Sequence, residues 1–331
     1  MKVLVIGGSG FIGTRLLAAL RLAGHEVRNL DLLASASHSE VTTIGDVRDV
    51  AAVTVASAGT DVIVNLAAAH RDDVRPLSVY ESVNVGGARV VAEAAVANGV
   101  ERILFTSSVA VYGLKRPHPN EDSLAEPFNE YGRTKLLAEG VLRRWADQDT
   151  RRSLAVVRPA VVFGEENRGN VYTLAKQVVS GRFLFIGDGS NRKSMGYVEN
   201  LVAYLERCLE APTGVSVTNY ADSPDLTTRE LVGLIRDTLG LQPTSNRALP
   251  KPVGLAAGHV FDLLSRVTGR AFPISAVRVQ KFCAETTIDT TRLRASGFRP
   301  TVAVPDAVRR TVQAEFGSQS EAPSTPGSPA A

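Results

Sequence analysis

Cysteine, methionine and tryptophan are scarce in this chain, and their scarcity excludes several classes of protein. The 331 residues include two cysteines, two methionines and one tryptophan. The cysteines, Cys208 and Cys283, lie far apart and have no second Cys or His at the spacing of a metal site. Neither a disulfide framework nor a metal site is therefore predicted, and a reducing cytoplasm is the compartment that fits.

Long apolar runs and a large excess of one charge are also missing. The first apolar run, Val3 to Ile6, is much shorter than the core of a signal peptide, and no run approaches the roughly 20 apolar residues that cross a bilayer. We therefore expect neither export nor membrane insertion. The 37 basic and 34 acidic side chains leave a net charge of +3, with no dense basic block to follow a phosphate backbone. Nucleic acid is not an expected partner.

The chain does contain enough apolar sequence, 44% of its residues, for a large core. Its first half alternates short β-branched runs with helical patterns. The expected strands are Val3–Ile6, Glu26–Leu30, Val41–Ile44, Val62–Leu66, Arg102–Thr106 and Leu154–Val157. This alternation predicts an α/β fold with a doubly wound parallel sheet of the Rossmann type, in which helices cross over between the strands.

The sequence also predicts how the chain is divided. Residues 1–164 are expected to form a first, Rossmann-type domain that includes two long amphipathic helices, Ser82–Ala97 and Tyr131–Trp145. Residues 165–316, richer in Gly and Pro loops, are expected to form a smaller mixed α/β substrate lobe, with some exchange of chain between the lobes. Residues 317–331 have too little apolar surface to order, and a disordered tail is predicted.

A glycine-rich segment, residues 7–13, follows the first expected strand and opens the first expected helix. In this context glycines permit a tight turn and let a pyrophosphate approach the backbone amides, while the helix dipole favours its negative charge. A dinucleotide site is therefore predicted, with an ordinary strand-to-helix turn as the alternative. The candidate contacts are Gly7, Gly10, Phe11, Ile12 and Gly13.

Two aspartates follow the next expected strands. Asp31 lies near the roughly 20-residue offset at which a carboxylate accepts hydrogen bonds from the adenine ribose. A carboxylate there repels a 2′-phosphate, so NAD is favoured over NADP, although Arg28 is close in the sequence. Asp46, followed by Val47, stands where it could reach the adenine amino group. The alternatives are a turn or capping role for Asp31 and an Asx turn at Asp46.

Tyr131 and Lys135 are four residues apart in a helical pattern, so their side chains share one helix face. A phenol is a poor base at neutral pH, but a nearby ammonium and a positively charged nicotinamide ring would lower its pKa. Tyr131 could then exchange a proton with a sugar hydroxyl. Taken alone, such a pair is more often an exposed helix face.

Ser108 follows the expected strand Arg102–Thr106, at the sheet edge where ligands of open α/β folds bind. Its hydroxyl could orient a substrate oxygen, although serine is also a routine turn residue. No His or Asp stands at a spacing that would make Ser107 or Ser108 a hydrolase nucleophile. Ser108, Tyr131 and Lys135 together therefore favour hydride chemistry.

These residues resemble the extended short-chain dehydrogenase/reductase family, in particular its nucleotide-sugar epimerase and dehydratase branch. The resemblance covers about residues 1–315. The glycines of residues 7–13 are similar to the family's Gly-x-x-Gly-x-x-Gly motif. The other matching motifs are Leu66-Ala67-Ala68, Asn84-Val85-x-Gly87, residues 106–113 around Ser108, residues 131–135 from Tyr131 to Lys135, and residues 158–164. The resemblance adds Leu66, Ala67 and Ala68 to the expected cofactor contacts.

The resemblance also extends to the second half of the chain. Residues 187–192 and 197–200 are similar to the family's substrate segment, which implies that Arg192 contacts the diphosphate of a nucleotide sugar. Asn170 and Tyr197 are further substrate candidates. The resemblance implies NAD in the first lobe, a sugar C4 facing the nicotinamide, and a homodimer formed through the two long helices.

Two departures from the family pattern bear on the substrate. The dehydratases of this branch carry Asp-Glu after the catalytic hydroxyl, whereas this chain has Val109-Ala110, so sugar dehydration is not expected. Galactose epimerases of the family carry Arg-Arg-x-Gly-Asp near the end. The comparable residues here, 275–282, read Ser-Ala-Val-Arg-Val-Gln-Lys-Phe and do not contain that motif. Arg278 is the candidate replacement.

Three functions are compatible with these residues. The favoured one is an NAD-dependent 4-epimerase of a UDP-hexose or UDP-N-acetylhexosamine, acting through a transient 4-keto sugar, in a polysaccharide or glycoconjugate route by family analogy. The second is an NAD(P)H-dependent reductase of a nucleotide-linked 4-keto-6-deoxy sugar. The third is a non-catalytic dinucleotide-binding sensor, which would not need Ser108, Tyr131 or Lys135.

Overall fold

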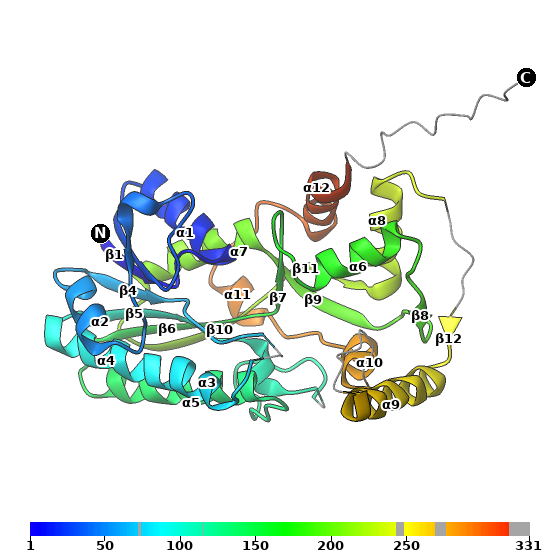
Figure 1. Cartoon of the computed structure of the whole chain (residues 1–331). Coiled ribbons are helices and arrows are strands. Elements are labelled where there is room, and N and C mark those ends of the chain that lie inside the picture. Colours follow the sequence, from blue (N-terminus) through cyan, green and yellow to red (C-terminus); the bar gives the residue numbers. More distant parts are fainter. Residues whose placement is uncertain (72–73, 115, 243–247, 269–275, 318–331) are drawn as a thin grey trace, which may run out of the picture. The chain divides into compact units, whose positions relative to one another are not determined.

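The structure is a computed structural model that describes residues 1–71, 74–114, 116–242, 248–268 and 276–317, without the side chains of 262–268, 276–278 and 281. The predicted disordered tail, from residue 318 onward, lies outside the described residues. The chain forms two compact units (Figure 1). Unit 1 consists of residues 1–162, 194–223 and 286–301, and unit 2 of the other described residues.

A seven-stranded parallel sheet forms the centre of unit 1, which confirms the expected fold class. The strand order is β10-β6-β5-β4-β1-β2-β3, so the chain reverses its direction of winding between β1 and β4. The strands are β1 (Lys2–Ile6), β2 (Glu26–Asp31), β3 (Thr42–Ile44), β4 (Val62–Asn65), β5 (Arg102–Thr106), β6 (Ser153–Pro159) and β10 (Gly214–Tyr220). Ligands of such sheets bind where the winding reverses.

The central strands are buried because helices cover both faces of the sheet. Val3–Ile6 of β1, all of β4 and all of β6 are buried. Six of the seven strands were located from the sequence, and the signal for β1, β4 and β6 is that a strand covered on both faces reads as a continuous apolar run rather than an alternating one. β10 is the exception: it comes from beyond residue 164 and mixes apolar with polar residues.

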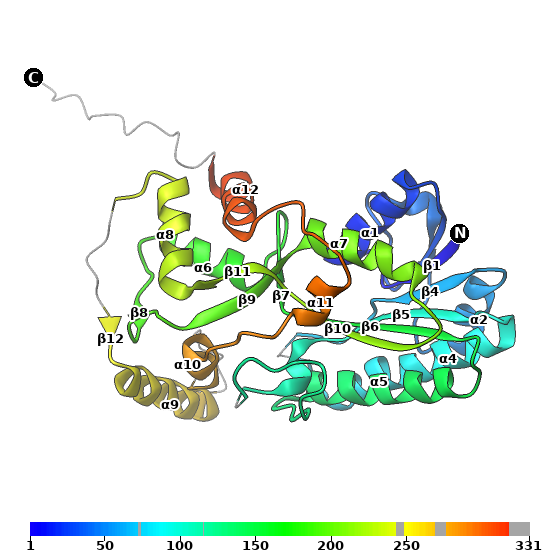
Figure 2. The ribbon, with the colours of Figure 1, turned by 180° about the vertical axis from the view of Figure 1, so that it is seen from behind.

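The helices of unit 1 form two layers, with α2, α4 and α5 on one face of the sheet and α1 and α7 on the other (Figures 1 and 2). The α-helices are α1 (Phe11–Leu22), α2 (Val50–Ser57), α3 (Ser78–Tyr80), α4 (Gly87–Asn98), α5 (Glu130–Asp147), α7 (Val198–Arg207) and α11 (Thr291–Ala295). A π-helical segment, Glu81–Gly86, precedes α4. Short 3₁₀ turns occur at Ser39–Val41, Val109–Tyr112 and Cys208–Glu210.

Unit 2 is mainly helical. Its helices are α6 (Asn170–Val179), α8 (Thr228–Thr238), α9 (Lys251–Thr268), α10 (Ala276–Cys283) and α12 (Val304–Phe316), and its two-residue strands β8 (Phe185–Ile186) and β12 (Ala248–Leu249) pair in parallel. The strands β7 (Val161–Phe163), β9 (Arg192–Tyr197) and β11 (Asp222–Thr227), at which the chain passes between the units, form a three-stranded sheet in the order β11-β9-β7. No helix in the described part of the chain is long and apolar enough to span a bilayer.

Candidate active site

The glycine-rich segment joins β1 to α1 through positions that only glycine can occupy. Gly7 has a φ of 84°, a left-handed conformation that disfavours a side chain. A Cβ atom on Gly7 would lie 2.7 Å from the backbone nitrogen of Ala67, and one on Gly13 would lie 2.5 Å from the Cα atom of Gly8. Packing against neighbouring backbone therefore fixes these two glycines.

Gly10 differs because the protein leaves space beside it. The nearest atom to a Cβ on Gly10 would be the carbonyl oxygen of Gly7, at 3.7 Å, an ordinary contact. Gly10 is also the N-cap of α1, and it has no side chain to accept from the first N–H groups of that helix. An open position at a helix N-terminus fits a pyrophosphate, whose charge the helix dipole favours. Phe11 and Ile12, both half-buried, follow in the first turn.

Asp31, at the end of β2, lies against this segment. Its Oδ2 atom accepts a hydrogen bond from the backbone N–H of Ser9 at 2.9 Å, and its Oδ1 atom accepts one from Leu33 at 3.0 Å. The aspartate therefore has the turn role that the sequence left as an alternative, at a place that also suits the ribose contact. Arg28 points elsewhere: its Nη1 atom donates to the carbonyl oxygen of Ala58, after α2, at 2.9 Å.

Asp46 forms the Asx turn that the sequence favoured equally with an adenine contact. Its Oδ1 atom accepts from the backbone N–H of Arg48 at 2.9 Å, and its carboxylate also pairs with the Arg48 guanidinium. These hydrogen bonds lower the pKa of Asp46 below its ordinary value. Val47 is buried, and a Cβ atom on Gly87 would lie 2.9 Å from its Cγ1 atom.

Ser108 and Tyr131 come together because the start of α5 packs against the turn that follows β5. The side chain of Asn129 caps α5 by accepting from the backbone N–H of Gly132 at 2.9 Å. A Cβ atom on Gly132 would lie 2.4 Å from the carbonyl oxygen of Ala110, so only glycine permits this approach. This packing brings Tyr131, in the first turn of α5, close enough to Ser108 for that side chain to affect the pKa of Tyr131.

The pKa values of the candidate catalytic pair differ from those of free side chains. Burial raises the pKa of Tyr131 above its ordinary value, and the Ser108 side chain offsets part of that rise. Burial lowers the pKa of Lys135 to about 7, and the Glu139 carboxylate opposes the shift. The Lys135 ammonium donates to the carbonyl oxygen of Thr106 at 2.7 Å. Tyr131 therefore holds its proton firmly in the protein alone.

A buried network that the sequence did not reveal supports Ser107, the neighbour of Ser108. The Ser107 hydroxyl donates to Oε1 of Glu139 at 2.5 Å, and the Arg158 guanidinium donates to both oxygens of the same carboxylate, at 2.9 and 2.6 Å. Arg158 also donates to the Tyr112 hydroxyl at 2.7 Å. Removing one member of such a buried pair typically costs about 3–5 kcal/mol.

Asn84, in the π-helical segment, links the two halves of the site. Its side-chain amide accepts from the backbone N–H of Ala69 at 2.9 Å and donates to the Thr134 hydroxyl at 2.9 Å. It thereby connects the turn that contains Leu66, Ala67 and Ala68 to the helix that carries Tyr131. The only sequence signal for this contact was the resemblance of residues 84–87 to a family motif.

The expected cofactor and catalytic residues all belong to unit 1, whereas the expected substrate residues are divided. Tyr197, in unit 1, is buried, and its backbone N–H donates to Asp222 at 2.7 Å. Asn170 and Arg192 belong to unit 2 and are exposed. Arg192 donates to the carbonyl oxygen of Asp225 at 2.9 Å. The Arg278 side chain is outside the described residues. No group of His, Cys, Asp and Glu in the described part of the chain is placed to hold a metal ion.

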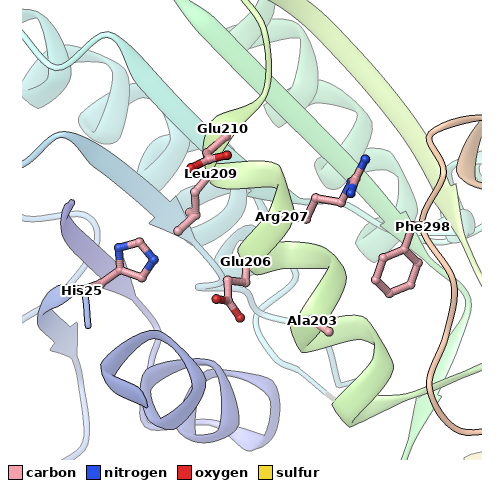
Figure 3. Close-up of a pocket in the computed structure, with 7 residues that line it drawn as sticks. All are labelled: His25, Ala203, Glu206, Arg207, Leu209, Glu210 and Phe298. Carbon is pink, nitrogen blue, oxygen red and sulfur yellow. The ribbon is translucent and has the colours of Figure 1, made fainter. Parts of the chain in front are cut away.

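Unit 1 also has a pocket, of about 380 Å³ (Figure 3). It lies at the N-terminal ends of the parallel strands, whereas the candidate active site lies at their C-terminal ends. His25 precedes β2 and Glu210 precedes β10, so the pocket lies where the parallel strands begin. Gly7, Asp31 and Ser108 lie where strands end. The pocket is therefore separate from the candidate active site; its lining residues are His25, Ala203, Glu206, Arg207, Leu209, Glu210 and Phe298.

Comparisons with known proteins find relatives that match most of the chain. The N-acetyl-alpha-D-glucosaminyl-diphospho-ditrans,octacis-undecaprenol 4-epimerase of Escherichia coli O157:H7 is 48% identical over 95% of this chain and 95% of its own length. The UDP-glucose 4-epimerase of Vibrio cholerae is 29% identical, over 81% of this chain and 85% of its own. The solved structure of the Thermus thermophilus UDP-glucose 4-epimerase complex with NAD has a TM-score of 0.74 at 23% identity, and the match covers 96% of this chain and 100% of the other.

A family model gives the same assignment. The model described as the NAD dependent epimerase/dehydratase family matches residues 3–220, a range that includes the glycine segment, Ser108, Tyr131 and Lys135. This match confirms the resemblance that the sequence motifs indicated, the expected class of enzyme and the expected cofactor, NAD. The chain belongs to the NAD dependent epimerase/dehydratase family.

Proposed function

We propose that this protein is a 4-epimerase that inverts C4 of N-acetylglucosamine while the sugar is attached through a diphosphate to undecaprenol. The observation that carries the proposal is the likeness to the Escherichia coli enzyme of that name, at 48% identity over 95% of both chains. Ser108, Tyr131 and Lys135 are present in this chain, and their positions support the same chemistry. The setting would be the assembly of a polysaccharide or glycoconjugate.

The proposed carrier, undecaprenol, differs from UDP, which the sequence motifs favoured. A UDP-linked sugar and an undecaprenol-linked sugar both present a diphosphate next to the anomeric carbon, so the motifs for the sugar and the diphosphate do not separate them. UDP-N-acetylglucosamine is the second candidate; the 29% likeness to the Vibrio cholerae UDP-glucose 4-epimerase supports its UDP carrier. A lipid carrier has no base or ribose to bind, which agrees with the departure from the family pattern at residues 275–282.

Unit 1 would hold the cofactor and carry out the proton transfer. NAD, when bound, supplies the reversible acceptance of the C4 hydride. The open position at Gly10 fits its pyrophosphate, and Asp31 suits the adenine ribose. Asp46, Val47 and residues 66–68 complete the proposed cofactor contacts.

Tyr131 would move the proton at the C4 oxygen, and Ser108 would orient that oxygen. Since burial raises the pKa of Tyr131, its hydroxyl is a weak base in the protein alone. A positive charge nearby lowers the pKa of a phenol. Tyr131 would therefore become an effective base only beside an oxidised nicotinamide ring, which couples proton removal to the presence of the hydride acceptor.

Arg192 is the proposed contact for the diphosphate, because its guanidinium is exposed and suits forked contacts with phosphate oxygens. Its present partners are the Asp225 carbonyl oxygen and, at 3.9 Å, the Glu230 carboxylate. Asn170, Tyr197 and Arg278 remain candidates for contacts with the sugar or the carrier.

The test is to offer the purified protein two substrates in parallel without adding any nicotinamide. One sample receives N-acetylglucosaminyl diphospho-undecaprenol in detergent, and the other receives UDP-N-acetylglucosamine. We expect the 4-epimer, N-acetylgalactosamine, in the first sample after mild acid release. Conversion of only the UDP-sugar would replace the lipid carrier by UDP. Activity only with NAD(P)H and a nucleotide-linked 4-keto-6-deoxy sugar would instead support the reductase.

A cytoplasmic homodimer is also part of the proposal. Leu137 of α5 and Val96 of α4 are 43% and 55% exposed on the two long helices that would form the interface. The two cysteines are free thiols, which suits a reducing compartment. Light scattering should give twice the mass of the chain, and Leu137→Asp should give the monomer mass. A wild-type monomer would contradict the proposed dimer.

A further inference from the structure

Helix α9 of unit 2 exposes an apolar strip. Val253 is 49% exposed and Val260 is 57% exposed, and Ala256 between them is also exposed. Their spacing of three and four residues places the three side chains on one face of the helix. Because they lie on one face, these three side chains form a continuous apolar strip that can pack against another apolar surface.

The other side of α9 is attached to its own unit. Gly254 and Gly258 are buried. A Cβ atom on Gly254 would lie 2.7 Å from Cγ2 of Ile186 in β8, so the helix backbone packs directly on that strand. This close contact fixes the rotation of α9 and leaves Val253 and Val260 facing outward. Within unit 2, α9 lies beside α10 and at the end away from α12 (Figures 1 and 2).

The segment around α9 also carries an unusual charge. From Arg247 to Lys281, both included, the sequence has six of the 37 basic residues but only one of the 34 acidic ones. The net charge of this segment therefore exceeds the +3 of the whole chain, and the remainder of the protein is slightly acidic. Lys251, at the start of α9, is exposed. A local basic excess of this kind is attracted to an anionic surface.

We propose that α9 binds the surface of an anionic phospholipid membrane, with Val253, Ala256 and Val260 entering the headgroup region and Lys251, at the start of the helix, meeting lipid phosphates. A helix that exposes an apolar strip and belongs to a basic segment of sequence lies in the membrane interface rather than across it. The purpose of the contact rests on the proposed function, because a polyprenol-linked sugar resides in the membrane and the enzyme must reach it there.

The experiment is sedimentation of the full-length protein with vesicles, without substrate. One set of vesicles contains equal amounts of phosphatidylglycerol and phosphatidylcholine, and the other contains phosphatidylcholine alone. We expect the wild-type protein to sediment with the anionic vesicles and about tenfold less with the neutral ones, with binding that weakens as salt is added. Failure to sediment with the anionic vesicles would overturn the proposal.

A double variant and a matched control locate the contact. Val253→Asp with Val260→Asp should reduce binding to the anionic vesicles by about tenfold or more, because two carboxylates would enter the apolar strip. The control is Val55→Asp, at a valine that is 75% exposed on α2 of unit 1. It should bind as the wild type does. An equal loss in both variants would show that the contact lies elsewhere.

Two further measurements separate this inference from its alternatives. Light scattering without vesicles should give the double variant the same mass as the wild type; a lower mass would mean that the strip joins two copies of the chain, which would overturn the proposal. In detergent, where docking is not needed, the double variant should epimerise the lipid-linked sugar at the wild-type rate. If vesicles are bound but no lipid-linked sugar is converted by either protein, the proposed function fails while the membrane contact stands.

Discussion

Two candidate binding regions are built in different ways. The glycine segment of unit 1 depends on tight backbone packing, whereas the candidate diphosphate contact of unit 2 is a single exposed side chain. Gly7 and Gly13 are held where a Cβ atom would lie 2.7 Å and 2.5 Å from neighbouring backbone atoms. Arg192, in contrast, is half exposed and held by one carbonyl oxygen and a distant carboxylate. Backbone packing tolerates almost no substitution, whereas an exposed side chain can be exchanged at little cost to the fold.

The comparison suggests why members of one family can share a cofactor and differ in the carrier of the sugar. In the proposed site, the groups that recognise the cofactor are part of the packing where the strands end, so they are retained as long as the fold is. Carrier recognition depends on exposed groups and on loops that the fold does not require. The following changes test whether this division is correct, from the largest expected effect to the smallest.

Tyr131→Phe should have the largest effect, and only on the chemistry. Turnover should fall by about two or more orders of magnitude, because the general acid/base is lost. The fold and NAD affinity should be retained, as measured by circular dichroism and by titration with NAD. Near-normal turnover would remove Tyr131 from its proposed role.

Two glycine substitutions should separate the effect of packing on stability from the effect of cofactor contact on NAD affinity. They are Gly13→Ala and Gly10→Ala. Gly13→Ala places a methyl group against the Gly8 backbone and should lower the free energy of unfolding by about 1–3 kcal/mol. Gly10→Ala meets an ordinary 3.7 Å contact and should lower the free energy of unfolding by only about 0.5–1 kcal/mol, the cost of alanine at a helix N-cap. It should nevertheless weaken NAD binding by about tenfold, or 1.4 kcal/mol. Unchanged NAD affinity in Gly10→Ala would mean that the pyrophosphate lies elsewhere.

The buried ammonium of Lys135 predicts a dependence of stability on pH. Because the folded protein lowers the pKa of Lys135 from 10.5 to about 7, the unfolded chain binds more protons between these values. The free energy of unfolding should therefore rise with pH across this window and lose that contribution below it. Between about pH 7 and pH 9, urea denaturation should show wild type gaining about 2 kcal/mol relative to Lys135→Met. Parallel pH profiles would contradict the shifted pKa.

Arg192→Ala should have the smallest effect and none on the fold. The Michaelis constant for the lipid-linked sugar should rise by roughly tenfold, with turnover little changed, because a charge-assisted contact to the diphosphate is lost. Arg229→Ala is the matched control, since Arg229 is an exposed arginine of the same unit that donates to the Asp188 carbonyl oxygen at 3.1 Å. Equal Michaelis constants for Arg192→Ala and wild type would place the diphosphate elsewhere.

The sequence predicted those parts of the molecule that depend on contacts close in the chain. The strands around the glycine segment and the positions of Ser108 and Tyr131 follow from local patterns and short spacings. The network of Ser107, Glu139 and Arg158 did not, because it joins a strand end, a helix and another strand whose residues carry no shared pattern. β10 was also missed, since its burial depends on pairing with β6 and not on its own composition.

Retention of the C4 hydrogen is the most direct test of the central claim, that the protein inverts C4 through a hydride held on its own NAD. The substrate is N-acetylglucosaminyl diphospho-undecaprenol with deuterium at C4, supplied in detergent to the purified protein in ordinary water without added nicotinamide. The account predicts an N-acetylgalactosamine product that retains the deuterium at C4. A product that carries solvent hydrogen at C4, or one that forms only as added nicotinamide is consumed, would contradict it.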